Sequence, residues 1–153
     1  MPTHPLTLLA LGPEDARLAA DFVHRLIVEL SGDPDIPTSP YREAAADLLG
    51  SGRIGGAKAL VAGQVAGLIL LDDCAAIYAG GRFGEITELY VLPGYRSQGV
   101  AARLIGWAVA QGQARGWRRI EVGAPALPEW QRSFDFYRRE GFAEVGPRLR
   151  RLL

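Results

Sequence analysis

The feature that most constrains the fold is a strand, a tight turn and a helix that follow one another within residues 84–115. The apolar run that ends at Val91 is typical of a strand, and a Pro-Gly pair breaks it two residues later. From Gly99 to about residue 115, apolar residues recur at helical spacing, and "RRIEVGA" at 118–124 is typical of a second strand. So short a helix between two strands predicts parallel neighbours joined by a right-handed crossover.

The rest of the chain is predicted to alternate between short helices and strands. Proline, glycine and aspartate separate the periodic segments and mark the turns. The predicted elements are a strand over 6–11, a helix from 12 to about 31, a short helix over 41–49, a hairpin over 57–71 with its turn at Gly63–Gln64, a strand from about 84 to 91, a last helix opened by Pro128 and closed by Gly141, and one or two strands within 142–153. The fold class that follows is α/β with a mixed α+β sheet.

Composition is typical of a globular domain and argues against several kinds of partner. The 153 residues suit one domain, 1–153, and 48% of them are hydrophobic. The formal net charge is zero, so we expect no nucleic-acid and no membrane partner. No signal peptide or membrane-spanning stretch is predicted, and the single cysteine fits a reducing compartment. We therefore expect a cytoplasmic protein.

The turn at 93–99 allows two interpretations. It is either an ordinary turn or a cradle for an anion, because unpaired backbone N–H groups at a helix N-terminus point at a bound ligand. The turn lies at the carboxyl end of a strand, where open α/β sheets bind ligands, and Arg96 adds a guanidinium suited to phosphate oxygens. It lacks the Lys-Ser/Thr pair of a P-loop and the three-glycine dinucleotide fingerprint. Spacing alone leaves both interpretations open.

Two motifs resemble the GNAT superfamily of acyl-CoA-dependent N-acyltransferases. "ELYVLPGYRSQGVAARLI" at 88–105 is similar to its central motif, a strand ending in Val-x-Pro followed by Arg/Gln-x-x-Gly-x-Gly/Ala, with Ala101 in the last small position. "FDFYRREGF" at 134–142 resembles its Phe/Leu-Tyr-x-x-x-Gly-Phe signature. The resemblance implies a mostly antiparallel sheet with a splayed parallel strand pair, flanked by about four helices.

The same resemblance implies acetyl-CoA as co-substrate and no metal. The pantetheine arm would pair with backbone groups near Leu89 and Val91, one of which would polarise the thioester carbonyl, and the pyrophosphate would lie on 96–101. The family often has Asn and Ala where this chain has Trp130 and Ser133, so an Asn contact to the cofactor would be missing. The implied cofactor-binding residues are Leu89, Tyr90, Val91, Arg96, Ser97, Gln98, Gly99, Val100, Ala101 and Ser133.

Glu85 and Glu88 are the candidate general bases. An alkylammonium with a pKa near 10 must lose a proton before it attacks a thioester. Glu85 falls where the histone-acetyltransferase branch carries its glutamate base, and Glu88 falls where several small-amine acetyltransferases carry an acidic residue. Their odd separation puts them on opposite faces of a regular strand, unless a bulge intervenes. Either could also be a solvated carboxylate or an ion-pair partner, and Glu85 is the preferred base.

Tyr137 matches the tyrosine that many family members use to protonate the leaving thiolate. A phenol with a pKa near 10 is a reasonable donor to a thiolate whose conjugate acid has a pKa near 8.5. The alternative is an aromatic residue in the core face of the last helix. Cys74 has no adjacent base, and His4 and His24 are not arranged as metal ligands, so we expect no covalent acyl-cysteine and no metal site.

The predicted function is an N-acetyltransferase that moves an acetyl group from acetyl-CoA to a primary amine by direct attack in a ternary complex. The alternative is a non-catalytic acyl-CoA-binding regulatory module. The acceptor would be a small molecule or a peptide, and loop aspartates such as Asp33 and Asp35 would suit a cationic amine or simply form turns. The arginines at 148, 150 and 151 are expected on a solvated or subunit edge, which is compatible with a homodimer.

Overall fold

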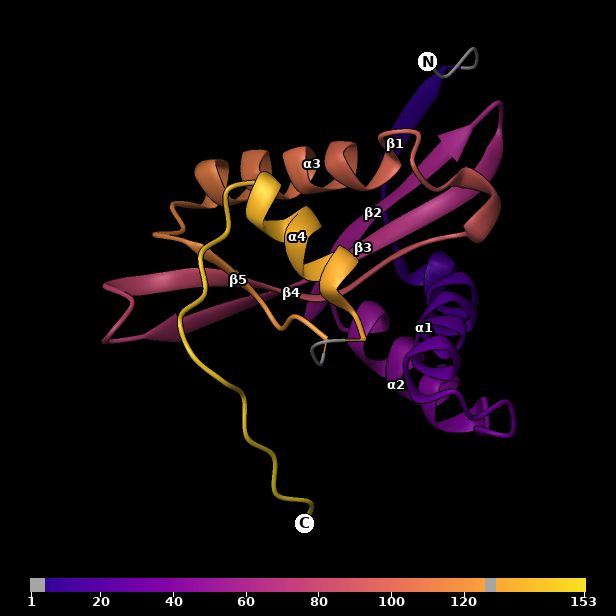
Figure 1. The fold of residues 1–153 in the computed structure, drawn as a ribbon, viewed down its shortest axis with the longest axis horizontal. Helices are drawn as coiled ribbons and strands as arrows, with labels where there is room; N and C mark the ends of the chain where they lie inside the picture. Colours follow the sequence, from indigo (N-terminus) through magenta and orange to yellow (C-terminus); the bar gives the residue numbers. More distant parts are fainter. Residues whose placement is uncertain (1–4, 126–128) are drawn as a thin grey trace.

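A computed structural model describes residues 5–125 and 129–153, and a five-stranded sheet forms its centre (Figure 1). The elements in chain order are β1 (Leu6–Ala10), a 3-10 turn (Pro13–Asp15), α1 (Ala16–Ser31), α2 (Ser39–Gly50), β2 (Ile54–Val61), β3 (Gln64–Ala76), β4 (Gly81–Val91), a 3-10 turn (Pro93–Tyr95), α3 (Val100–Arg115), β5 (Ile120–Val122) and α4 (Gln131–Arg139). Among the described residues, no helix is long and apolar enough to cross a membrane. Pro128, the predicted start of the last helix, lies outside the described residues.

The sheet has the order β1-β2-β3-β4-β5, and only β4 and β5 pair in parallel. The predicted fold class, a mostly antiparallel mixed sheet with one parallel pair and about four helices, is confirmed. The parallel ladder joins three residue pairs and ends where Ile86 faces Val122. Because β4 continues to Val91, residues 87–91 have no β5 partner, and the two strands part there.

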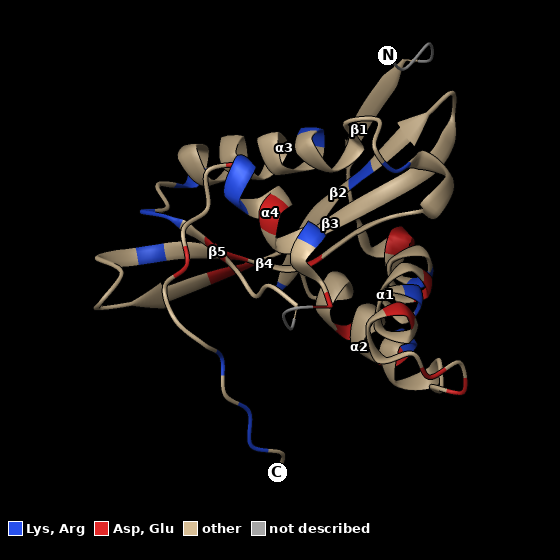
Figure 2. Ribbon diagram, in the orientation of Figure 1, with Lys and Arg blue, Asp and Glu red and all other residues tan. Residues whose placement is uncertain are grey.

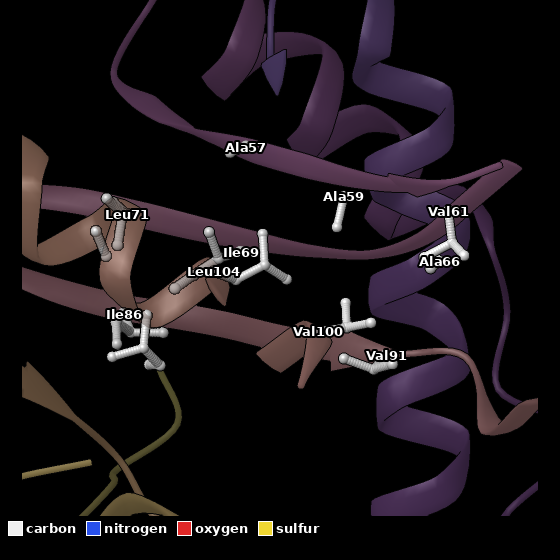
Figure 3. Close-up of a cluster of buried hydrophobic side chains, with 12 residues drawn as sticks. Ala57, Ala59, Val61, Ala66, Ile69, Leu71, Ile86, Val91, Val100 and Leu104 are labelled. Carbon is white, nitrogen blue, oxygen red and sulfur yellow. The ribbon is translucent and has the colours of Figure 1, made fainter. Parts of the chain in front are cut away.

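Helices cover both faces of the sheet. One face carries α1 and α2, and the other carries α3 and α4. Figure 3 shows the cluster beneath α3, in which Leu104 lies beside Ile69 of β3 and Val100 lies beside Val91 of β4. Leu68 belongs instead to the cluster beneath α1 and α2. Since alternate residues of β3 face opposite helical layers, both of its faces are buried, which explains its long apolar run.

Several predicted boundaries shift for local reasons. The hairpin turn consists of Ala62 and Gly63, both at positive φ (51° and 81°), as a tight two-residue hairpin requires, and the predicted turn residue Gln64 already belongs to β3. The strand predicted over 118–124 is only three residues long, because β5 pairs with β4 only at residues 84–86 of β4.

The prediction of one or two strands within 142–153 is wrong. This segment is an irregular coil that leaves α4, passes β5 and extends away from the sheet (Figure 1). Gly146 has a φ of 134° and Pro147 lacks an N–H donor, so the middle of the segment cannot form a regular ladder. Its leucines remain on the surface, where Leu149 is 95% exposed.

Candidate active site

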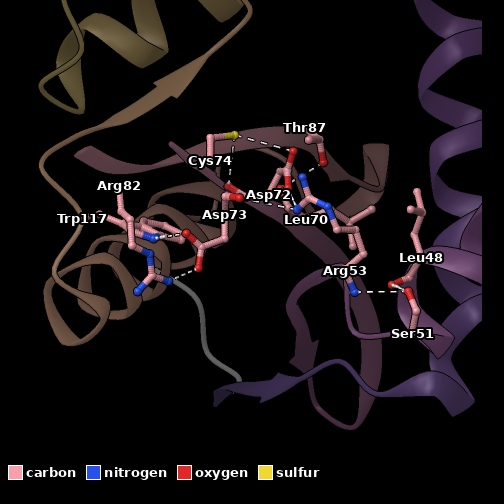
Figure 4. A network of polar contacts seen from close by, with 10 residues as sticks. All are labelled: Leu48, Ser51, Arg53, Leu70, Asp72, Asp73, Cys74, Arg82, Thr87 and Trp117. Atoms are coloured by element: carbon pink, nitrogen blue, oxygen red, sulfur yellow. Dashed lines mark hydrogen bonds and ion pairs between the residues drawn. The ribbon is translucent and has the colours of Figure 1, made fainter. Parts of the chain in front are cut away.

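A β-bulge places the two candidate bases on the same face of the sheet. Leu70 pairs with Glu88 and Leu71 with Ile86, so Thr87 is an extra residue in β4. The Thr87 hydroxyl donates to the Leu70 carbonyl at 3.4 Å (Figure 4). The extra residue cancels the odd separation of Glu85 and Glu88, and both lie on the face covered by α1 and α2. A regular strand would put Glu85 and Glu88 on opposite faces, but the bulge puts them on the same face, which is the exception named in the sequence analysis.

Four carboxylates share this face, which we call the acidic face: Asp72 of β3, Glu85 and Glu88 of β4, and Glu121 of β5. Cross-strand pairing explains the set, because Glu85 lies opposite both Asp72 and Glu121. Figure 2 shows the acidic positions where β4 and β5 lie together. Asp73, which follows Asp72 in β3, points to the other face of the sheet. It accepts a hydrogen bond from Trp117 Nε1 at 2.9 Å (Figure 4).

Three of the four carboxylates have an arginine partner. The ion pairs are Asp72 with Arg53, Glu85 with Arg148 at 2.6 Å, and Glu121 with Arg119 at 2.8 Å. Within the described part of the chain, Glu88 forms no such pair. Burial, with a smaller contribution from the charge of Glu85, raises the pKa of the Glu88 carboxyl. Glu88 is thus the less neutralised of the two candidates.

Cys74 lies on the same side of β3 as Asp72, and its thiol is held in the protonated form. Burial, together with the charge of Asp72 and a hydrogen bond to it, raises the pKa of Cys74 to about 11. The thiolate is the nucleophilic form of cysteine, and little of it exists at neutral pH with such a pKa. Cys74 is therefore poorly suited to act as a nucleophile.

The end of β4 exposes backbone groups on its open edge. Leu92 N–H donates to the carbonyl of Ala66 in β3 at 2.8 Å. Alternate residues of an antiparallel strand direct their backbone groups to the same side, so Tyr90 and Glu88 also direct theirs toward β3. Leu89 and Val91 therefore direct theirs toward the gap left by β5. These are the two residues that the resemblance assigns to the pantetheine arm. The side chain of Leu89 packs under α3, whereas Tyr90 is buried on the opposite face.

The turn after β4 presents a run of unpaired backbone donors. Ser97 and Gly99 have positive φ values of 63° and 81°, and the first backbone bond of the following helix joins Arg103 N–H to the Gly99 carbonyl at 3.1 Å. Between described residues, the six N–H groups of 97–102 donate to no protein acceptor. We call this set the anion cradle. The side chain of Gln98 donates to the Gly94 carbonyl at 3.3 Å and so links the cradle to the start of the turn.

The guanidinium of Arg96, which the sequence predicts as a phosphate ligand, contacts three protein groups. Its Nη1 and Nη2 donate to both carboxylate oxygens of Glu29 at 2.7 and 2.9 Å, and its Nε donates to the Val91 carbonyl at 2.9 Å. The guanidinium also lies over the Tyr90 ring, 5.3 Å from its centroid. The hydrogen bonds from Arg96 lower the pKa of Glu29. All three guanidinium nitrogens therefore have protein partners, and Arg96 ties the turn to α1.

Helix α4 borders the anion cradle and contributes a residue that the sequence did not reveal. Arg132 Nη2 donates to the Ser97 hydroxyl at 3.0 Å, which places a positive charge at the rim of the cradle. Ser133, its neighbour in the first turn of α4, is partly buried beside it. Only the folded chain brings 97 and 132 together. The sequence signal was limited to the adjacent Ser133, which the resemblance had assigned to the cofactor.

Tyr137 lies on the inner side of α4 within an aromatic cluster. Its ring packs edge-on against Phe136 and Phe142, with centroids 5.4 and 5.7 Å away. Burial raises the pKa of Tyr137 to about 12. The phenol is therefore a weaker acid than the ordinary value used in the sequence argument, and it suits hydrogen-bond donation better than complete proton transfer.

Comparisons with known proteins agree with this geometry. Residues 22–142 match the profile of the acetyltransferase (GNAT) family. The aminoalkylphosphonate N-acetyltransferase of Salmonella typhimurium is 29% identical over 124 residues, which cover 81% of this chain and 79% of that protein.

Two solved structures have the same fold. A GCN5-related N-acetyltransferase from Ralstonia eutropha JMP134 has a TM-score of 0.82 at 19% identity, covering 97% of this chain and 99% of that one. A protein described as a predicted acetyltransferase, from Clostridium acetobutylicum and solved with acetyl-CoA, has a TM-score of 0.78 at 18% identity, covering 97% of this chain and 96% of that one. The profile match spans most of the strands and helices described above. The chain therefore belongs to the acetyltransferase (GNAT) family and is an acetyl-CoA-dependent N-acetyltransferase.

Proposed function

We propose that this protein acetylates a primary amine on the acidic face by direct attack in a ternary complex, with Glu88 as the general base. The observation that carries this proposal is the position of Glu88. It is the carboxylate of the acidic face without an arginine among the described residues, and it immediately precedes Leu89 on the open edge of β4. Glu85, preferred from the sequence, is already held by Arg148.

The residues fit acetyl-CoA in two places. The anion cradle supplies six unpaired N–H groups at a helix N-terminus, which suit a pyrophosphate. Apart from its neighbours in the chain, no described residue has an atom within 4 Å of a Cβ built on Gly99. The open edge of β4 would offer the pantetheine arm the backbone groups of Leu89 and the N–H of Val91, whose carbonyl already accepts from Arg96 Nε. When bound, acetyl-CoA supplies the acetyl group as a thioester.

The chain's own residues would then do three things. Glu88 removes a proton from the acceptor ammonium, and its raised pKa makes it a better base than an ordinary carboxylate. A backbone N–H of Leu89 or Val91 donates to the thioester oxygen as negative charge develops there. Tyr137 donates a hydrogen bond to the departing sulfur.

We propose the acceptor only as a class, a small primary amine. The family activity requires an amine, and the relative from Salmonella typhimurium is named for a small one, an aminoalkylphosphonate. This supports a small primary amine more than a peptide. A panel of amines, assayed for release of free thiol from acetyl-CoA, tests the function directly. We expect turnover with at least one small primary amine, and binding of acetyl-CoA without turnover of any amine would favour a regulatory module instead.

Replacing Tyr137 with phenylalanine should lower turnover by about tenfold, which is less than the hundred- to ten-thousandfold contribution usual for a positioned general acid. The effect should be modest because a phenol with a pKa of about 12 donates a hydrogen bond without transferring its proton fully. The ring contacts with Phe136 and Phe142 remain, so acetyl-CoA affinity and the unfolding temperature should change little.

Acyl donors with more acidic thiols provide the control for this role. A better leaving group needs less help from a donor, so the loss in Tyr137→Phe should shrink as the thiol becomes more acidic. Wild-type turnover in the variant, or a loss that does not depend on thiol acidity, would assign Tyr137 to core packing alone.

A further inference from the structure

The charges on the acidic face are nearly balanced. Four carboxylates are accompanied by three arginines, so the described residues leave one negative charge uncompensated, that of Glu88. One ammonium group at Glu88 would neutralise this face. A second ammonium on the same acceptor would need another carboxylate, and each remaining one is already paired.

Arg148 differs from the other two arginines in where it comes from. Arg53 immediately precedes β2 and Arg119 immediately precedes β5, whereas Arg148 belongs to the irregular C-terminal segment. Its side chain is 71% exposed, while that of its partner Glu85 is 25% exposed. Arg148 can therefore be changed without disturbing a strand or a helix, and its charge is directed at the acidic face from outside the sheet.

The path of Arg148 to Glu85 passes close to a glycine. A Cβ built on Gly123, just after β5, would lie 2.8 Å from Arg148 Nη1 and 3.1 Å from its Cδ. The arginine thus crosses the end of β5 in close contact with bare backbone before Nη1 reaches Glu85 Oε1 at 2.6 Å. The contact with Gly123 and the ion pair are separate observations, and the ion pair places the guanidinium beside Glu85.

We propose that Arg148 is a specificity-determining residue that restricts the acceptor to amines with a single positive charge. By neutralising Glu85, it leaves Glu88 as the one carboxylate for an ammonium group and repels a second ammonium on the same acceptor. This inference rests on the proposed function, because it requires the acceptor to bind on the acidic face. It adds a selectivity against diamines and polyamines, which membership of the family does not imply.

Propylamine and 1,3-diaminopropane provide the test, since they differ by one ammonium group. We expect the wild-type enzyme to have the higher kcat/KM with propylamine. In Arg148→Gln, the kcat/KM of the diamine relative to the monoamine should rise about fivefold, the size of one partly exposed charge interaction. Arg148→Lys should keep the wild-type ratio, because it keeps the charge.

Arg150→Gln is the matched control, because it removes the same charge from the same segment at a position with no ion pair to any described residue. It should leave the ratio unchanged. An unchanged ratio in Arg148→Gln, with both amines still acetylated, would overturn the specificity role and leave the proposed function standing. If the wild-type enzyme acetylates neither amine nor any other on the panel, the proposed function fails, and this inference fails with it.

Discussion

Replacing Gly99 with glutamate should weaken acetyl-CoA binding by at least about a hundredfold. Gly99 has a φ of 81°, a left-handed conformation that costs a residue with a Cβ about 1–2 kcal/mol. The larger effect is electrostatic, because the new carboxylate would stand among the six N–H groups of the anion cradle. It would accept their hydrogen bonds itself and repel a pyrophosphate from the same place. Calorimetric titration with acetyl-CoA measures the loss.

Gly106 in α3 is the matched control for this substitution. A Cβ built there meets no atom within 4 Å, its φ is not in the left-handed region, and it lies in the same helix that starts at the cradle. Gly106→Glu should therefore keep the affinity for acetyl-CoA. Gly99→Ala separates strain from charge, and it should lose much less affinity than Gly99→Glu. If folded Gly99→Glu binds acetyl-CoA as tightly as the wild type, the anion cradle is not the cofactor site.

The cradle was predictable because its information is local. A strand that ends before a Pro-Gly pair and a helix that begins at a glycine leave few backbone conformations for the residues between them. The pairing of Arg96 with Glu29 was not predictable in this way. The two residues are 67 positions apart, and only the packing of α1 beside the end of β4 brings the carboxylate to the guanidinium. The sequence shows that Arg96 is basic, but it does not show which carboxylate becomes its ion-pair partner.

The candidate bases show the same limit in a different form. The sequence places Glu85 and Glu88 on one strand, but their relative orientation depends on the extra residue at Thr87, which has no signature in a strand of this composition. The arginines that pair with carboxylates of the acidic face come from the residues just before β2 and β5 and from the C-terminal segment. The strands expected within 142–153 fail because Gly146 and Pro147 act on the backbone, whereas the prediction followed side-chain pattern.

Replacing Glu88 with glutamine should reduce turnover at neutral pH by about a hundred- to ten-thousandfold, the usual contribution of a positioned general base. The amide keeps the shape of the side chain and cannot accept the ammonium proton. The loss should shrink as the pH approaches the amine pKa near 10, where free amine is abundant. In the wild type, turnover should fall on the acidic side at a pH above the ordinary glutamate range, because burial raises the pKa of Glu88.

Glu85→Gln is the matched control, since it makes the same change on the same strand and the same face. It breaks the pair with Arg148 and should keep most of the turnover at neutral pH. If Glu85→Gln shows the pH-dependent loss and Glu88→Gln does not, the assignment of the base is reversed. A loss in Glu88→Gln that is equal at every pH would instead mean that Glu88 binds the charge of the acceptor without removing its proton.

Stability provides the last check that Glu88→Gln acts on chemistry. The pKa of Glu88 is higher in the folded chain than in the unfolded chain, so the folded state binds the proton more tightly and ionised Glu88 lowers the free energy of unfolding at neutral pH. Glutamine removes that penalty. The variant should therefore unfold at the same temperature as the wild type or higher at pH 7, and its advantage should disappear below the unfolded pKa near 4.3. A variant that is less stable at pH 7 would place Glu88 in a structural hydrogen-bond network, and its lost activity would no longer identify a base.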